Sequence, residues 1–164
     1  MKRLGLLALI LLLPACGLRP LYAGGGSGAV ATSLKSVSVA PIEGRAGWLV
    51  RTALEDRLGN GKGGGAAYRL EVELDDDITG FGIRRDDAVT RERRTLRARY
   101  RLVDARGTVV LDATAGSDAG VDVVGSEYAT LAAEQTALER LSREVADQIV
   151  TRLALYASRT GAGR

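Results

Sequence analysis

The stretch "RERRTLRARYR" (residues 91–101) decides the fold, because two patterns alternate within it. Leu96, Ala98 and Tyr100 occupy every second position, and arginines fill most of the positions between and before them. Successive side chains of a strand point to opposite faces, so this period of two predicts a strand with one face in the core and one in water. Six arginines in eleven residues also raise the question whether the wet face binds a polyanion.

The residues that follow predict a hairpin. "DARG" (104–107) is typical of a four-residue connection with glycine last. If Val103 lies opposite Thr108, the apolar residues of both strands share one face, in the pairs Leu102–Val109, Tyr100–Leu111 and Ala98–Ala113, and Arg99 lies opposite Asp112 on the other. A slip of one residue would turn the apolar side chains outward, so this register is the expected one.

A strand, a helix and a second strand are predicted before the hairpin. "SVSVAPI" (36–42) alternates and ends at a proline, which indicates a short strand. After Gly44, apolar residues recur at helical spacing until Gly59, a typical helix C-terminus; they are Trp48, Leu49, Ala53, Leu54 and Leu58. The next strand begins at Tyr68 and points Glu71, Glu73 and Asp75 outward, and "TGFGIRRDDA" (79–88) is interpreted as the turn that follows it.

A long amphipathic helix closes the chain over residues 126–158. Its apolar stripe, predicted to pack in the core, consists of Leu131, Leu138, Leu141, Val145, Ile149 and Leu153. The element order is thus β-α-β-β-β-α. Consecutive hairpins give a largely antiparallel sheet, and two helices cover one of its faces. The predicted fold class is α+β, a two-layer α/β sandwich with a four-stranded sheet and two helices on one face.

The N-terminus has the pattern of an exported lipoprotein. Lys2 and Arg3 precede a ten-residue apolar run, which is too short to span a membrane, and "LLPAC" ends at Cys16, the only cysteine. This resembles a lipobox, in which the signal is cut before the cysteine and the cysteine carries diacylglycerol and an N-acyl chain. We therefore expect a signal peptide at 1–15, a lipidated flexible tether at 16–34 and a single domain at 35–160.

The composition argues against several classes of function. The chain has no histidine, and acylation would consume its one thiol, which removes Ser-His-Asp and Cys-His catalysis and most transition-metal sites. We predict no enzyme, no cofactor and no metal site. A hydrolase using Asp75, Asp76 and Asp77 is disfavoured because consecutive strand residues face opposite sides. Without its signal the chain is close to neutral, so nucleic acid is not an expected partner.

Four segments together resemble one family: "CGLRPLY" (16–22), "VRTALEDRL" (50–58), "GFGIRRDDAVTRER" (80–93) and residues 128–156. With the lipobox and the element order, the chain resembles the lipopolysaccharide-assembly lipoprotein family LptE in its alphaproteobacterial form. The resemblance implies an outer-membrane lipoprotein on the periplasmic side that plugs the β-barrel LptD and helps deliver lipopolysaccharide to the outer leaflet. The alternative is an accessory or substrate-binding lipoprotein of another envelope transport system.

Three uses of the arginines stay open. They can form an ordinary charged surface, paired with Glu71, Glu73, Asp75 and Asp112 on the adjacent strands. They can bind the phosphates of lipopolysaccharide, since the arginine fork suits phosphate. The candidates for this are Arg91, Arg93 and Arg94, which have fewer expected acidic neighbours, together with Arg84 and Arg85 in the preceding turn. The charged face can also dock against the polar lumen of a barrel.

Overall fold

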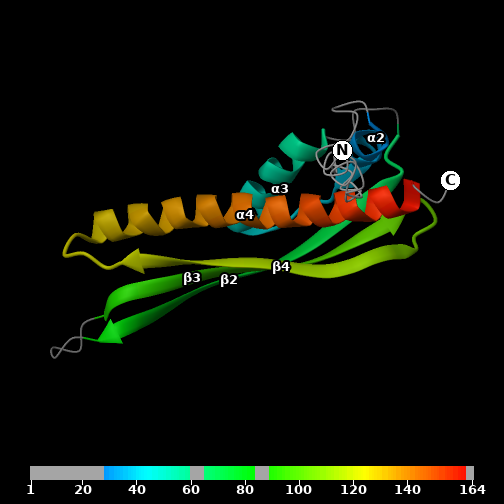
Figure 1. Cartoon of the computed structure of the whole chain (residues 1–164). Coiled ribbons are helices and arrows are strands. Elements are labelled where there is room, and N and C mark those ends of the chain that lie inside the picture. The colour runs from blue at the N-terminus through cyan, green and yellow to red at the C-terminus, as the bar shows by residue number, and fades with distance from the viewer. Residues whose placement is uncertain (1–27, 60–64, 84–88, 162–164) are drawn as a thin grey trace, which may run out of the picture.

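Three helices lie on one side of a four-stranded sheet in the computed structural model of this chain (Figure 1). The structure describes residues 28–59, 65–83 and 89–161. The elements are α2 (Ala29–Lys35), β1 (Val37–Val39), α3 (Gly44–Leu58), β2 (Tyr68–Ile83), β3 (Val89–Asp104), β4 (Val109–Asp122) and α4 (Glu127–Gly161). The strand order is β1-β2-β3-β4; β1 is parallel to β2 and the other pairs are antiparallel. The predicted fold class is confirmed.

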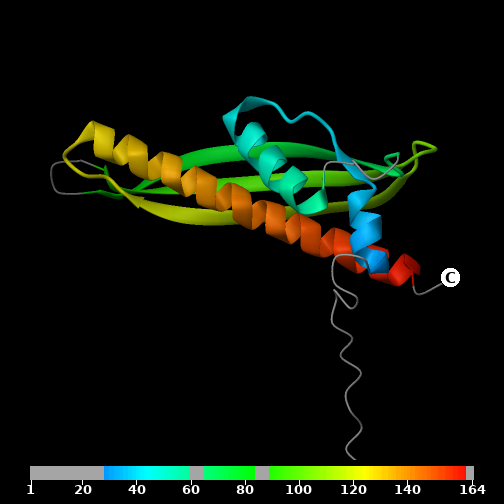
Figure 2. The same ribbon diagram turned by 90° about the horizontal axis from the view of Figure 1, so that it is seen from above.

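Helix α2 lies where the sequence predicts the end of the flexible tether, so residues 29–34 correct that prediction. Val30 and Leu34 are four residues apart and share one side of the helix. Leu34 is only 5% exposed, and α2 packs beside the C-terminal end of α4 (Figure 2). A helix of seven residues is unstable alone, and α4 provides the apolar surface that stabilises it. Residues 16–27 of the predicted tether lie outside the described residues.

The hairpin of β2 and β3 is longer than predicted. Its pairs run from Tyr68 opposite Asp104 to Ile83 opposite Val89. Residues 79–83, expected in a turn, continue β2, and 84–88 lie outside the described residues. Gly80 and Gly82 suggested a turn because glycine is common there, but glycine can also occupy a strand, where it often marks an irregularity. Gly82 has a φ of +77°, which favours glycine over other residues.

The predicted register of β3 with β4 is wrong by two residues. Asp104, not Val103, lies opposite Thr108, so the connection consists of residues 105–107, three residues instead of the predicted four, with Gly107 at φ +83°. A bulge then adds one residue at Val110, so that the apolar pairs are Leu102–Leu111, Tyr100–Ala113 and Ala98–Ala115. The shorter connection and the bulge each shift the register by one residue; either shift alone would reverse the faces of β4, whereas the two together restore them. From Leu111 onward the faces are therefore those predicted, although the partners differ. Val109, predicted on the apolar face opposite Leu102, instead lies opposite Val103 and is 47% exposed, because it precedes the bulge.

The core lies between α3, α4 and the helix-facing side of the sheet. Most of the predicted stripe of α4 is fully buried against Leu96, Tyr100 and Leu102. Besides Val109, two predicted core residues are exposed: Leu131 is 49% exposed and Trp48 is 64% exposed. In Figure 1, β2 and β3 curve away from the first turns of α4, whereas the end of β4 stays beside them. Trp48 lies outside the buried side of α3, which consists of Gly47, Val50, Ala53, Leu54 and Leu58.

Candidate functional site: the charged sheet face

Five arginines of β3 point away from the helices. Their neighbours in the strand, among them Leu96 and Tyr100, are buried on the helix side. Strand alternation therefore places these arginines on the uncovered face, as predicted; they are Arg91, Arg93, Arg97, Arg99 and Arg101. At about 3.3 Å per residue, the row extends over roughly 33 Å. We call it the arginine row.

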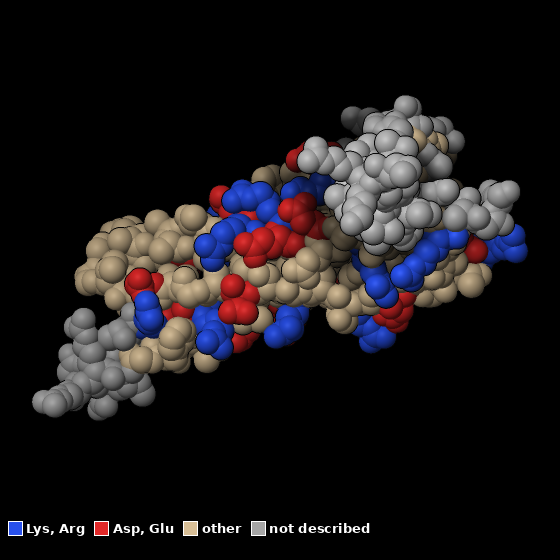
Figure 3. Space-filling model, viewed as in Figure 1, with Lys and Arg blue, Asp and Glu red and all other residues tan. Residues whose placement is uncertain are grey.

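Acidic residues line both sides of the arginine row. On β2, Glu71, Glu73 and Asp75 lie opposite Arg101, Arg99 and Arg97, so the acidic residues of β2 border the row at the positions expected. Arg101 lies 3.6 Å from Glu71 and 3.5 Å from Glu73. The space-filling view shows positive and negative side chains alternating along the lower margin of the molecule (Figure 3).

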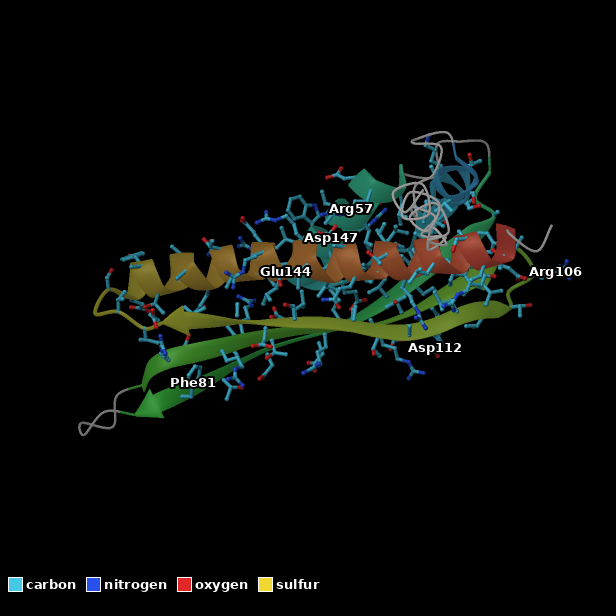
Figure 4. The ribbon with its side chains drawn as sticks, viewed as in Figure 1. Arg57, Phe81, Arg106, Asp112, Glu144 and Asp147 are labelled. Carbon is cyan, nitrogen blue, oxygen red and sulfur yellow. The ribbon has the colours of Figure 1, made fainter. Side chains whose placement is uncertain are left out.

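Asp112 of β4 closes the other side of the row. Its register partner is Arg101, yet Arg99 reaches it diagonally, with Nη2 3.1 Å from Oδ2. Figure 4 shows Asp112 on the side of β4 away from the helices. The hydrogen bond and the positive charge of Arg99 hold the pKa of Asp112 below its usual value. The predicted contact of Arg99 with Asp112 thus exists, in a different register.

Arg91 and Arg93 have acidic partners that the sequence analysis did not expect. Arg91 Nε lies 2.8 Å from Asp122, and Arg93 Nε lies 3.9 Å from Asp118. The guanidinium of Arg93 also stacks 5.4 Å from the ring centroid of Phe81. The expectation of few acidic neighbours is wrong because β4 continues to Asp122 and follows β3 along nearly its whole length.

Arg94 lies on the other face, beneath α4. Its Nε and Nη2 donate to the two carboxylate oxygens of Asp76 at 2.8 Å and 2.6 Å, and Nη1 donates to the backbone carbonyl of Glu134 at 3.1 Å. The side chain is 13% exposed, so these contacts tie β3 to β2 and α4. The other predicted site residues, Cys16, Arg84 and Arg85, lie outside the described residues.

Arg97 is the member of the row that the sequence analysis missed as a candidate. No residue of the described ranges forms an ion pair with it, although Asp75 lies opposite. It lines a hollow of about 540 Å³ together with Glu73, Asp75, Arg99, Thr114 and Gly116. Gly116 leaves room there: a Cβ at this position would lie 3.3 Å from Nη1 of Arg97. A glycine inside a strand was the available signal, since it often marks a close approach.

Across 28–59, 65–83 and 89–161, the structure brings together no group of three or more His, Cys, Asp or Glu side chains able to hold a metal ion. Among the helices described, none combines the length and the apolar character needed to cross a membrane.

The helix-covered sheet with its charged open face defines a small α/β domain of the kind found in bacterial lipoproteins. The family profile described as "LptE: Lipopolysaccharide-assembly" matches residues 34–153, well over half of the chain. The chain therefore belongs to the LptE family, and the family expected from the sequence is confirmed. No curated protein sequence matches the chain.

Solved lipoprotein structures share this fold. A lipoprotein from Caulobacter crescentus CB15 is 30% identical, with a TM-score of 0.68, and the match covers 81% of this chain and 98% of that one. A minor lipoprotein from Acinetobacter baumannii is 16% identical, with a TM-score of 0.60 and coverages of 73% and 90%. The rare lipoprotein B from Shewanella oneidensis is 11% identical, with a TM-score of 0.60 and coverages of 76% and 96%. The last two are similar in fold alone.

Proposed function

We propose that this chain is an outer-membrane lipoprotein, anchored through acylated Cys16, that assembles with the β-barrel LptD and helps deliver lipopolysaccharide to the outer leaflet. Membership of the lipopolysaccharide-assembly family supports the process. The lipobox at Cys16 supports the anchor. The protein acts in this proposal by binding and positioning, with no chemical step of its own.

The observation that carries the proposal is the uncovered sheet face. The helices occupy one side, and the other presents three adjacent columns of acidic, basic and acidic side chains. The lumen of a large barrel is polar, so a charged sheet face can pack against it without placing apolar side chains in a polar environment. Alternating charges also favour one orientation over others, because like charges in contact are unfavourable. We therefore assign this face to the barrel.

Lipopolysaccharide phosphates are assigned to the exposed arginines of the same face. Arg91 and Arg93 have carboxylate partners, but exposed ion pairs are weak, so a phosphate can replace the carboxylate at low cost. At Arg97 a phosphate would displace no carboxylate, because this arginine has no carboxylate partner among the described residues. Arg94 contributes least, since Asp76 already occupies its fork. Arg84 and Arg85, in the segment that precedes β3 in the sequence, stay in the proposal as predicted phosphate contacts.

Co-purification from the native envelope tests the partnership. The protein is cross-linked in intact cells, solubilised in detergent and isolated, and the attached chain is identified by mass spectrometry. We expect the LptD barrel. Recovery of the components of another transporter in its place would overturn the proposal in favour of the accessory-lipoprotein alternative.

Mass spectrometry of the mature N-terminus tests the anchor. The expected product begins at Cys16 and carries diacylglycerol and an N-acyl chain. A product that retains residues 1–15, or that begins elsewhere without lipid, would contradict this part of the proposal.

A further inference from the structure

The outer edge of β2 has a strand beside it along a small part of its length. β1 pairs with β2 at Tyr68, Arg69 and Leu70, after which the chain leaves the sheet for α3. From Glu71 onward, no described strand lies beside this edge. Figure 2 shows β2, in green, continuing past α3 along the margin of the sheet.

The backbone groups of this edge are positioned for pairing. The N–H of Tyr68 donates to the carbonyl of Ser36 at 3.2 Å, and the carbonyl of Leu70 accepts from the N–H of Ala40 at 2.9 Å. The even-numbered residues of β2 thus direct their backbone N–H and C=O groups away from β3, toward the outer edge of the sheet. The register with β3 is unbroken as far as Phe81, so the alternation continues along the edge. The outward-directed residues are Val72, Leu74, Asp76 and Ile78, which extend over about 20 Å.

The side chains along the edge define what kind of strand fits. On the open face, Glu71, Glu73, Asp75 and Asp77 form an acidic column, which has the basic column of β3 on one side only. On the helix side, Leu74 is half-buried and Ile78 is 41% exposed. A complementary strand would carry Lys or Arg at alternate positions and apolar residues between them, because opposite charges stabilise cross-strand pairs.

A second copy of this chain does not meet that requirement. Pairing β2 with β2 of another copy would place acidic columns side by side. The other edge strand, β4, is also acidic on the open face, with Asp112, Asp118 and Asp122. The basic strand β3 is interior and has no free edge.

We propose that the edge of β2 from Val72 to Ile78 binds an extended basic segment of another protein, which adds a fifth strand to the sheet. In this mode the backbone provides affinity, and the alternating side chains provide selectivity. The inference rests on the edge and its charges, and it holds whether or not the open face docks in a barrel.

Hydrogen exchange followed by NMR tests the proposal on the full mature chain. The probe is the synthetic peptide acetyl-KVKVKVKVK-amide, and the control is acetyl-KPKPKPKPK-amide, which has the same charge but cannot pair as a strand. The first peptide should slow exchange of the amides of Val72, Leu74, Asp76 and Ile78, and the second should not. Equal binding of both peptides, or binding that leaves these amides unchanged, would overturn the proposal. Slow exchange of these amides before any peptide is added would also overturn it, because the chain or a second copy would then already occupy the edge.

Charge reversal on the two edges gives the matched variants. Asp75→Lys combined with Asp77→Lys should weaken peptide binding about tenfold or more, equivalent to about 1.4 kcal/mol. Asp118→Lys combined with Asp122→Lys makes the same change of net charge at the β4 edge and should leave the affinity nearly unchanged. An equal loss in both variants would show attraction to net charge alone and would overturn the assignment to β2. The amide spectrum of each variant checks that the fold is intact.

Discussion

Arg94 binds Asp76 through both carboxylate oxygens, at 2.8 Å and 2.6 Å, on the helix-covered face of the sheet. The two residues are not register partners: Arg94 lies opposite Ile78, and Asp76 lies opposite Leu96. The ion pair therefore crosses the hairpin diagonally. It holds the guanidinium of Arg94 beneath α4. Arg94 therefore has a structural role, unlike the exposed arginine row on the other face.

Breaking this ion pair should destabilise the fold. Asp76→Asn or Arg94→Gln leaves a half-buried charge without its partner, and we expect the free energy of unfolding to fall by about 1–2 kcal/mol. Urea denaturation measures the change. Arg91→Gln is the matched control, because its ion pair with Asp122 is exposed and should contribute much less. Equal losses in the buried and exposed variants would contradict the structural role of Arg94.

Glu92 should make stability depend on pH. Burial of its carboxyl and the nearby charge of Glu134 raise the pKa of Glu92 in the folded protein. The folded state then binds the proton more tightly than the unfolded state, whose pKa is about 4.3. Stability from this group is present below about pH 4 and is lost as pH rises through the folded pKa.

The pH effect can be isolated by substitution. Glu92→Gln cannot ionise, so it should be more stable than the wild type at pH 7 and nearly equal to it near pH 3.5. Glu134→Gln should also increase stability at pH 7, because it removes the repelling charge. Urea midpoints at the two pH values measure this. A Glu92→Gln variant with the same difference from wild type at both values would refute the assignment.

Gly47 should not tolerate even alanine. A Cβ at this position in α3 would lie 2.6 Å from the backbone carbonyl oxygen of Ile42, so the helix would have to move. Alanine usually stabilises a helix relative to glycine by about 1 kcal/mol, but here we expect Gly47→Ala to cost about 1–3 kcal/mol. Thermal or urea unfolding measures it. Gly125→Ala, which has open space around the added Cβ, should change stability little.

The hollow beside Arg97 should contribute to lipopolysaccharide binding. Arg97→Gln removes one charge-assisted contact to phosphate, and we expect about tenfold weaker binding. Gly116→Val should act in the same direction by filling the hollow without changing charge. Binding to purified lipopolysaccharide measures both. Gly120→Val, with open space, and Arg106→Gln, in the distant turn labelled in Figure 4, should bind as the wild type does; equal losses in all four would exclude a local site.

The alternation of residues 96–102 was enough to predict which face of β3 is buried, because a strand places every second side chain on one side. The exact register was not predictable. The connection is one residue shorter than predicted, and the bulge at Val110 adds one residue. Each change shifts the register by one, and together they return the residues from Leu111 onward to the predicted faces, so the apolar pattern of that part of β4 fits both registers. The partners of individual arginines depend on that register.

Helical spacing likewise predicted α3 and α4, but it did not predict how much of each helix is buried by the rest of the fold. Leu131 follows the helical spacing of the stripe of α4, yet it is 49% exposed where β2 and β3 curve away from the first turns of that helix (Figure 1). Val30 and Leu34 were too few to indicate a helix, which forms because the end of α4 packs against it. Both outcomes depend on contacts between elements distant in sequence, to which local periodicity is insensitive.

Site-specific photo-cross-linking tests the central claim most directly. A photoreactive amino acid replaces Thr114 on the open face or, as a control, Gln135 on α4, in cells that make the native envelope. If the open face lies in the barrel, the Thr114 position should cross-link to LptD, and the Gln135 position should do so much more weakly. Cross-linking from Gln135 with none from Thr114, or capture of a different transporter at Thr114, would contradict the account.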